Sequence, residues 1–191
     1  LNGRNGTTQV TRRGAEAIVR TLVNGVGAEA RAAFMAANEH LAPQEFFVAT
    51  LDGRTTPICR SLDGNVYELG QGPRLPIHVG ERSLYSFVVD GQVIGLRPIR
   101  PFTMRQLVRE YASENGLGRI AALKRANLPR GHKGRFDEFA RRRMRELTGE
   151  VPARVTYGEF LRRQSIEFQD DVLGPARARL FRDGGLTLDR F

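Results

Sequence analysis

The apolar positions between residues 9 and 41 repeat every three or four residues, which is the spacing of side chains on one face of a helix. The repeat is carried by Ala15, Ile18, Val19, Leu22, Val23, Val26, Ala30, Ala33, Phe34, Ala37 and Leu41. We expect one long helix or two, with this stripe buried. Gly25 and Gly27 each disfavour a helix by about 1 kcal/mol relative to Ala, so we expect a break or a close packing contact near them.

Between residues 46 and 99, short apolar runs alternate with turn signals, a pattern that is typical of strands. The run at 46–49 precedes Asp52-Gly53, and a second Asp-Gly pair at 63–64 precedes an apolar run near Val66. The strongest hairpin signal is Asp90-Gly91, because apolar residues at 84–89 and 93–96 flank it. This region therefore predicts a small antiparallel sheet with hairpins.

Helical spacing returns after Pro101 and continues towards the end of the chain. Apolar stripes of this kind run over residues 104–111, 120–123 and 136–147. Thr156 and Glu159 have the spacing of a capping box, in which the two side chains bond to free backbone donors at a helix start. Pro175 suits a first helical turn and Gly184 suits a helix end, so these residues indicate one more helix.

These patterns predict an α+β fold with a long N-terminal helical region, a small antiparallel sheet with hairpins, and a helical C-terminal half. Residues 1–8 are polar and rich in Gly and Asn, so we expect a flexible tail there. We expect residues 9–100 to form the α+β core, and residues 101–191 to form a basic helical extension packed on it.

The positive charge of the chain is concentrated in one segment. The chain has 30 Lys and Arg against 21 Asp and Glu, a formal net charge of +9. Residues 92–149 hold 14 of the basic and five of the acidic residues, so this segment accounts for the whole excess. The asymmetry favours a polyanionic partner, and a solvated helical surface is the alternative. The residues expected to face the partner are Lys124, Arg125, Arg130, Lys133, Arg135, Arg141, Arg142 and Arg145.

Two kinds of partner suit such a surface. Phosphates of double-stranded DNA attract Lys and Arg without regard to sequence, and Arg also forms two-pronged bonds with carboxylates on an acidic protein surface. Aromatic residues make up 8% of the chain and Trp is absent, so little indicates base stacking or sequence-specific reading. The sequence leaves DNA and an acidic protein surface open.

Residues for catalysis or metal binding are scarce. The chain has three His and one Cys, which excludes an internal disulfide. A zinc site or a nucleophile pair built on Cys59 and His78 is conceivable, but a buried thiol and an ordinary histidine are the favoured interpretation. No serine elbow or phosphate-binding glycine loop occurs, so we predict no catalytic residue, no metal and no cofactor. No apolar run approaches the roughly 20 residues that span a bilayer, so we expect no membrane partner.

Several segments together resemble a known family. Residues 51–67 read LDGRTTPICRSLDGNVY, and residues 75–78 read LPIH. With the Ala/Arg-rich segment at 30–33 and the segments 156–164, 168–174 and 176–186, they resemble the phage Mu protein F-like minor head proteins, also called head morphogenesis proteins. The family signature places structural roles on Asp52, Thr55, Cys59, Asp63, Gly64, Pro76, His78 and Arg82. A Cys-Arg-Cys triplet of some members is replaced here by Glu81-Arg82-Ser83, which argues against a metal or redox role.

The resemblance implies a non-enzymatic virion component in the capsid interior near the portal, present in the host cytoplasm during assembly. The implied partners are the portal protein or the major capsid protein, together with packaged double-stranded DNA. The alternative is a phage-borne effector enzyme on the same scaffold, ADP-ribosyltransferase-like or a nuclease. Such an enzyme needs a cleft with convergent polar groups, for which the candidates are Arg54, Cys59, Asp63 and His78.

Overall fold

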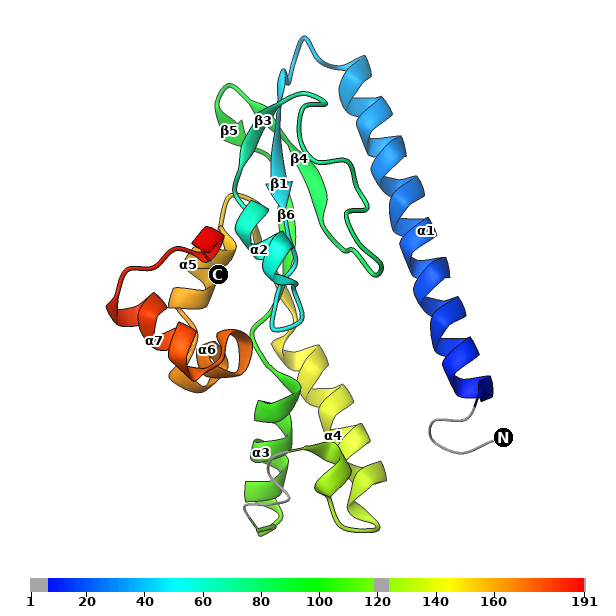
Figure 1. The fold of residues 1–191 in the computed structure, drawn as a ribbon, viewed down its shortest axis with the longest axis vertical. Coiled ribbons are helices and arrows are strands. Elements are labelled where there is room, and N and C mark those ends of the chain that lie inside the picture. Colours follow the sequence, from blue (N-terminus) through cyan, green and yellow to red (C-terminus); the bar gives the residue numbers. More distant parts are fainter. Residues whose placement is uncertain (1–6, 119–123, 191) are drawn as a thin grey trace. The chain divides into compact units, whose positions relative to one another are not determined.

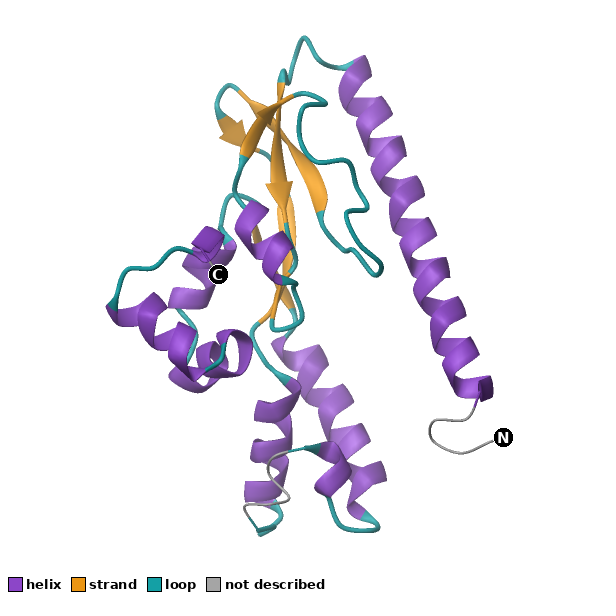
Figure 2. Ribbon diagram, in the orientation of Figure 1, coloured by secondary structure: helices purple, strands orange, loops and turns teal. Residues whose placement is uncertain are grey.

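The computed structural model describes residues 7–118 and 124–190 (Figure 1), with side chains from residue 11 onward. The chain divides into two compact units. The first unit comprises Leu1–Ala49 and Leu62–Gly95, and the second comprises Thr50–Ser61 and Leu96–Phe191. The fold is α+β, as the sequence predicts, with helices and strands in both units (Figure 2). The units differ from the predicted domains because residues 50–61 group with the C-terminal half.

The first unit begins with one uninterrupted helix, α1 (Thr7–Ala37). The predicted tail therefore ends sooner than residue 8, and its residues 1–6 lie outside the described part of the chain. The two glycines do not break α1. A Cβ added at Gly25 would lie 3.4 Å from the Pro76 ring, whereas one added at Gly27 would have nothing within 4 Å. Close packing is thus present at Gly25 only.

The apolar stripe of α1 is exposed, which corrects the prediction that it is buried. Its large side chains, Ile18, Val19, Leu22, Val23, Val26 and Phe34, are 58–70% exposed. Met35 alone among the described side chains of α1 is buried. Phe34 packs edge-on against Phe87 with 5.7 Å between ring centroids, and the middle of α1 is hydrogen-bonded to a loop of the same unit through Thr21 and Asn24. An apolar repeat with helical spacing predicts that one face of the helix is apolar, but it does not predict which residues pack against that face.

A four-stranded antiparallel sheet in the order β3-β1-β4-β5 completes the first unit. Its strands are β1 (Gln44–Val48), β3 (Val66–Glu68), β4 (Leu84–Val89) and β5 (Gln92–Val93). β1 is central, and four of its five residues are buried. Asp90 and Gly91 join β4 to β5 with positive φ angles of 49° and 73°, the conformation that favours Asp-Gly in two-residue hairpins. The hairpin prediction is confirmed.

A second sheet lies in the other unit, where the sequence predicted no separate one. It has the order β2-β6-β7, with β2 (Leu51–Asp52), β6 (Leu96–Arg100) and β7 (Gly149–Pro152). β2 and β6 are parallel, and β6 and β7 are antiparallel, so this sheet is mixed. Residues 96–100, expected to continue the hairpin sheet, belong to this second sheet instead. Because β2 and β6 are parallel and are not joined by a hairpin, no turn motif in the sequence predicts that they pair.

The helices of the second unit form two apolar clusters. The helices α3 (Met104–Glu114) and α4 (His132–Leu147) pack around Tyr111, Phe136 and Phe139. The helices α5 (Tyr157–Arg162), α6 (Ile166–Leu173) and α7 (Pro175–Asp183) contribute to the other cluster, around Tyr157 and Phe160. The remaining elements are α2 (Pro57–Leu62), the short 3-10 helix η2 (Arg125–Asn127), and η3 (Leu188–Arg190). The predicted stripe at 120–123 lies outside the described residues.

Candidate nucleic-acid interface

The second unit contains an open cavity of about 780 Å³ whose wall carries five arginines. They come from the turn after β2, the end of β6, the start of α3 and the last turns of α4: Arg54, Arg100, Arg105, Arg141 and Arg145. Two carboxylates, Asp52 and Asp171, also line it. We call this site the arginine cavity.

The sheet and one helix bring these arginines together. In the parallel pair, Asp52 lies opposite Arg100, so the chain leaves β2 and β6 at the same edge, and Arg54 follows two residues after Asp52. On α4, Arg141 and Arg145 are four residues apart and therefore project from the same helix face. The cavity thus depends on strand pairing between segments that lie far apart in the sequence.

The two carboxylates of the cavity are engaged by the protein itself. Asp171 accepts hydrogen bonds from Thr103 Oγ1 at 2.6 Å and from Arg109 Nη2 at 2.8 Å, and its side chain is 7% exposed. Arg105 is 3.7 Å from the same carboxylate. Asp52 is buried and accepts hydrogen bonds from the Arg54 backbone N–H and the Thr55 hydroxyl. Both acids are therefore held in place by hydrogen bonds within the second unit.

Four of the five arginines have no ion pair with any described residue: Arg54, Arg100, Arg141 and Arg145, all of them exposed. Guanidinium groups remain protonated in proteins, so the wall carries a formal charge of +3 after the two carboxylates are counted. The methionines Met104 and Met144 and the ring of Phe102 add apolar surface between the charges. An anion with several oxygens matches this combination.

Two of the eight predicted contact residues, Arg141 and Arg145, line the arginine cavity. Arg142 lies on another side of α4, 3.7 Å from Glu146 and over the ring of Phe139 at 5.8 Å. Arg125 is paired with Asp137 through two hydrogen bonds, the Nε–Oδ1 bond being 2.6 Å long. This bond lowers the pKa of Asp137, so the acid remains charged and neutralises Arg125.

The other four predicted residues lie towards the N-terminal end of α4, away from the cavity: Lys124, Arg130, Lys133 and Arg135. Arg135 donates to the carbonyl oxygen of Gly131 at 3.3 Å, and none of the four has an ion pair with a described residue. At 1.5 Å per residue, Lys133 and Arg145 are about 18 Å apart along the helix axis. α4 therefore carries Lys133 and Arg135 near its N-terminal end and Arg141 and Arg145 near its C-terminal end.

Some of the charge in residues 92–149 is used inside the fold. Arg97 is fully buried and donates from Nη1 to the carbonyl oxygens of Val155 at 2.7 Å and Ala153 at 3.4 Å. Arg143 is held between Glu110 at 2.7 Å and Glu146 at 2.8 Å. The composition therefore overstated the charge that this segment presents, while Arg54, outside the segment, was missed as a cationic contact.

The family-signature residues act as braces within their own units. In the second unit, Thr55 donates to the Thr50 carbonyl and to Asp52, which fixes the turn that carries Arg54, and Cys59 is buried in α2. In the first unit, Asp63 accepts from the Ala49 N–H at 2.6 Å, and Gly64, with a φ of 91°, donates to the Phe47 carbonyl. Each of these residues is thus held within its own unit by hydrogen bonds or burial.

The second part of the signature lies in the first unit. Pro76 packs near Gly25 and has a cis peptide bond before it. His78 Nε2 is 3.3 Å from Glu81 Oε2, and Glu81 Oε1 accepts from the backbone N–H groups of Arg82 and Ser83. Of the residues proposed for an enzymatic cleft, Arg54 and Cys59 belong to the second unit, and Asp63 and His78 to the first.

Comparisons with known proteins give no match. A scan against family models matches none, and searches of curated proteins and of solved structures find no similar protein. No helix in the described part of the chain is long and apolar enough to cross a membrane.

Proposed function

We propose that this chain is a non-enzymatic phage head morphogenesis protein whose second unit holds the backbone of packaged duplex DNA. The observation that carries the DNA contact is the convergence of Arg54, Arg100, Arg141 and Arg145 on one cavity, where none of the four forms an ion pair with a described residue. The resemblance to the minor head proteins supplies the setting, the capsid interior beside the portal. Docking on the portal or the major capsid protein belongs to the same proposal.

The chemistry of the arginine cavity favours phosphate. Arginine forms two-pronged bonds with phosphate oxygens, and the binding of several arginines to a duplex releases condensed counterions. A hollow of about 780 Å³ admits phosphates but not a double helix, so the contact is with the DNA backbone. Phosphate contacts position a protein on DNA without reading its sequence, in keeping with the absence of Trp.

The second cationic group extends the contact along α4. It comprises Lys124, Arg130, Lys133 and Arg135. Along the axis of α4, Lys133 of this group lies about 18 Å from Arg145, close to the length of five base-pair steps at about 3.4 Å each. One helix can thus present cations to phosphates on the same duplex at two places, which raises the number of counterions released.

A paired-variant experiment tests the proposal. Arg141→Gln/Arg145→Gln removes two charges from the arginine cavity, and the control Arg163→Gln/Arg179→Gln removes two charges from exposed arginines of the same unit outside the cavity. Affinity for a fluorescent 30-base-pair duplex is measured by anisotropy at several salt concentrations. We expect the cavity pair to lose about tenfold or more and the control pair less than about threefold.

Equal losses in the two variants would contradict a localised DNA site. If the full chain fails to bind DNA at low salt but binds purified portal protein, and the cavity pair abolishes that binding, then the cationic surface recognises carboxylates instead. Binding to both partners with the same dependence on Arg141 and Arg145 would mean that one cavity serves two polyanions.

A further inference from the structure

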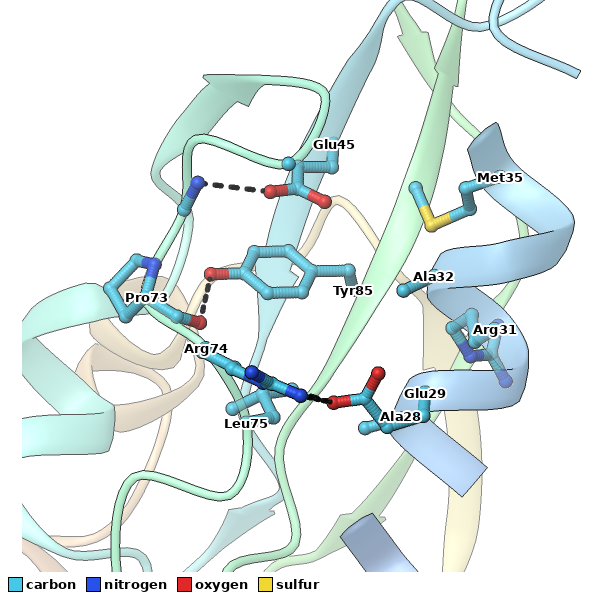
Figure 3. Close-up of a pocket in the computed structure, with 12 residues that line it drawn as sticks. Ala28, Glu29, Arg31, Ala32, Met35, Glu45, Pro73, Arg74, Leu75 and Tyr85 are labelled. Carbon is cyan, nitrogen blue, oxygen red and sulfur yellow. Dashed lines mark hydrogen bonds and ion pairs between the residues drawn. The ribbon is translucent and has the colours of Figure 1, made fainter. Parts of the chain in front are cut away.

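The first unit contains a second hollow, of about 220 Å³, with a different chemistry (Figure 3). It lies between α1, the strands β1 and β4, and the loop at residues 70–75. Its walls are largely apolar, with Ala28, Ala32 and Met35 from α1 and Leu75 from the loop. Two carboxylates line it: Glu45 enters from β1, and Glu29 of α1 is paired with Arg74.

Glu45 has the properties of a binding group. The residue is 5% exposed, and its Oε1 accepts a hydrogen bond from the Gly72 N–H at 3.1 Å. The other oxygen has no hydrogen bond to any described residue, and Figure 3 shows it turned from the loop towards the α1 side of the hollow. A buried carboxylate without a cation is costly, so a positively charged ligand at this oxygen is favoured.

The loop is shaped to hold Glu45 in this position. A Cβ at residue 72 would lie 2.3 Å from the Tyr85 hydroxyl and 2.8 Å from Glu45 Oε1, so only glycine allows the loop to approach so closely. The Tyr85 hydroxyl donates to the Pro73 carbonyl at 2.9 Å. Burial, followed by the charge of Glu45, raises the pKa of Tyr85, so the phenol remains neutral and keeps the proton that it donates to Pro73.

The hydrogen bond from Gly72 to Glu45 affects which kind of cation this carboxylate can bind. A guanidinium binds best through two parallel bonds to both carboxylate oxygens, and at Glu45 one of these bonds would have to share Oε1 with the Gly72 N–H. An ammonium is a compact donor that one oxygen suffices to hold. The apolar walls from Ala28, Ala32 and Met35 suit the methylene stem behind an ammonium.

The charged residues at the rim of the hollow distinguish between two kinds of ammonium ligand, a free diamine and the lysine side chain of a protein. Arg31 and Arg74 line it and are exposed, and Arg74 is bound to Glu29 at 2.6 Å. The second ammonium of a diamine would lie near these guanidiniums and be repelled by them. The backbone of a lysine residue in a protein is neutral, so at the rim it meets no such repulsion. We propose that this hollow binds the side chain of a lysine from a partner protein, with its ammonium on Glu45.

Ligand binding can be followed in the full chain through its methionine methyl groups, because the three methionines are divided between this hollow and the arginine cavity. Met35 lines this hollow, and Met104 and Met144 line the arginine cavity. Methyl-labelled protein is titrated with N-acetyl-lysine N-methylamide and, separately, with the norleucine analogue, which has no ammonium. We expect a saturable shift of the Met35 methyl with the lysine compound, at least about tenfold weaker binding of norleucine, and unmoved Met104 and Met144 signals.

Glu45→Gln tests the carboxylate. Its amide carbonyl can still accept from Gly72, but its amide N–H group faces the ammonium, so affinity should fall at least about tenfold. Glu68→Gln removes the same charge from an exposed residue of the same sheet and should change nothing. If Glu45→Gln does not fold, Ala32→Leu occupies the hollow, keeps Glu45 and a good helix former, and should cause a similar loss.

Three results would overturn the proposal. They are the absence of a Met35 shift, equal binding of lysine and norleucine compounds, and an undiminished affinity in Glu45→Gln or Ala32→Leu. Tighter binding of putrescine than of the lysine compound would assign the hollow to a free diamine and reject a partner's lysine as the source. The proposed DNA contact does not enter this experiment, since Met104 and Met144 report on it separately.

Discussion

The hydroxyl of Tyr157 donates a hydrogen bond to the main-chain carbonyl oxygen of Asp52 at 2.6 Å, and both residues are buried. This bond links the first residue of α5 to the strand that leads into the Arg54 turn, across 105 residues of sequence. The guanidinium of Arg60 lies over the same ring, 5.4 Å from its centroid. Tyr157 therefore holds together the part of the second unit from which the arginine cavity is built.

Tyr157→Phe should destabilise the second unit by about 1 kcal/mol, because the substitution leaves the Asp52 carbonyl without this buried donor. Urea unfolding followed by circular dichroism gives the free energy of unfolding. Tyr67→Phe is the matched control: its hydroxyl is bonded to the exposed Asn65 side chain, and its loss should cost less than about 0.5 kcal/mol. A similar loss of unfolding free energy in the two variants would show that the hydrogen bond from Tyr157 to Asp52 stabilises the fold no more than an exposed one does.

Asp171→Asn should move stability and DNA affinity in opposite directions. Asparagine can still accept from Thr103, but it no longer holds Arg105 and Arg109 by charge, so we expect a loss of about 1–3 kcal/mol in stability. The arginine cavity meanwhile gains one net positive charge, so duplex DNA should bind about two- to fivefold more tightly at low salt. Unfolding curves and anisotropy titrations measure the two effects, and weaker DNA binding by the folded variant would contradict the assignment.

The pair of Arg125 and Asp137 predicts a pH dependence. The hydrogen bond from Arg125 lowers the pKa of Asp137 in the folded state, so the pair contributes stability above the unfolded pKa, near 4, and loses it as pH falls through the lower folded value. The contribution is below about 1 kcal/mol, because both side chains are more than a third exposed. The stabilities of wild type and Asp137→Asn should converge between pH 5 and about pH 2, whereas a constant difference would contradict the pairing.

Exposure of the α1 stripe predicts which of its residues matter for folding. Val23→Gln should change the free energy of unfolding by less than about 0.5 kcal/mol, since Val23 is 65% exposed. Met35→Ala should cost about 2–4 kcal/mol, since Met35 is fully buried. Thermal or urea unfolding of the two variants compares them, and a large cost for Val23→Gln would show that the stripe is covered in solution.

The sequence predicted those elements whose signals are local. The Thr156–Glu159 capping box, the Asp90-Gly91 hairpin and the α7 boundaries at Pro175 and Gly184 are all present, because neighbouring residues suffice to make them. The α1 helix was also predicted, but its burial was not, because a helical repeat defines a face and not the surface packed against it. Local pattern thus predicted most helices and one sheet.

The composition of the candidate site could not be predicted, because it depends on long-range pairing. Arg54 and Arg100 meet Arg141 and Arg145 only because β2 pairs in parallel with β6, and no turn motif marks that pairing. Arg97 shows the opposite error, since an arginine in a basic segment is fully buried on backbone carbonyls. Charge counting treats these arginines alike, whereas the fold separates those that line the cavity from those that are buried inside the unit.

The most direct measurement of the central claim is the salt dependence of duplex DNA binding by the full chain and by Arg54→Gln/Arg100→Gln/Arg145→Gln. Each phosphate contact contributes about 0.9 to the slope of log affinity against log salt concentration. We predict that the triple variant has a slope shallower by about 2–3 and a weaker affinity at low salt. An unchanged slope in a folded variant, or no binding of wild-type protein to DNA at low salt, would contradict the arginine cavity as the DNA contact.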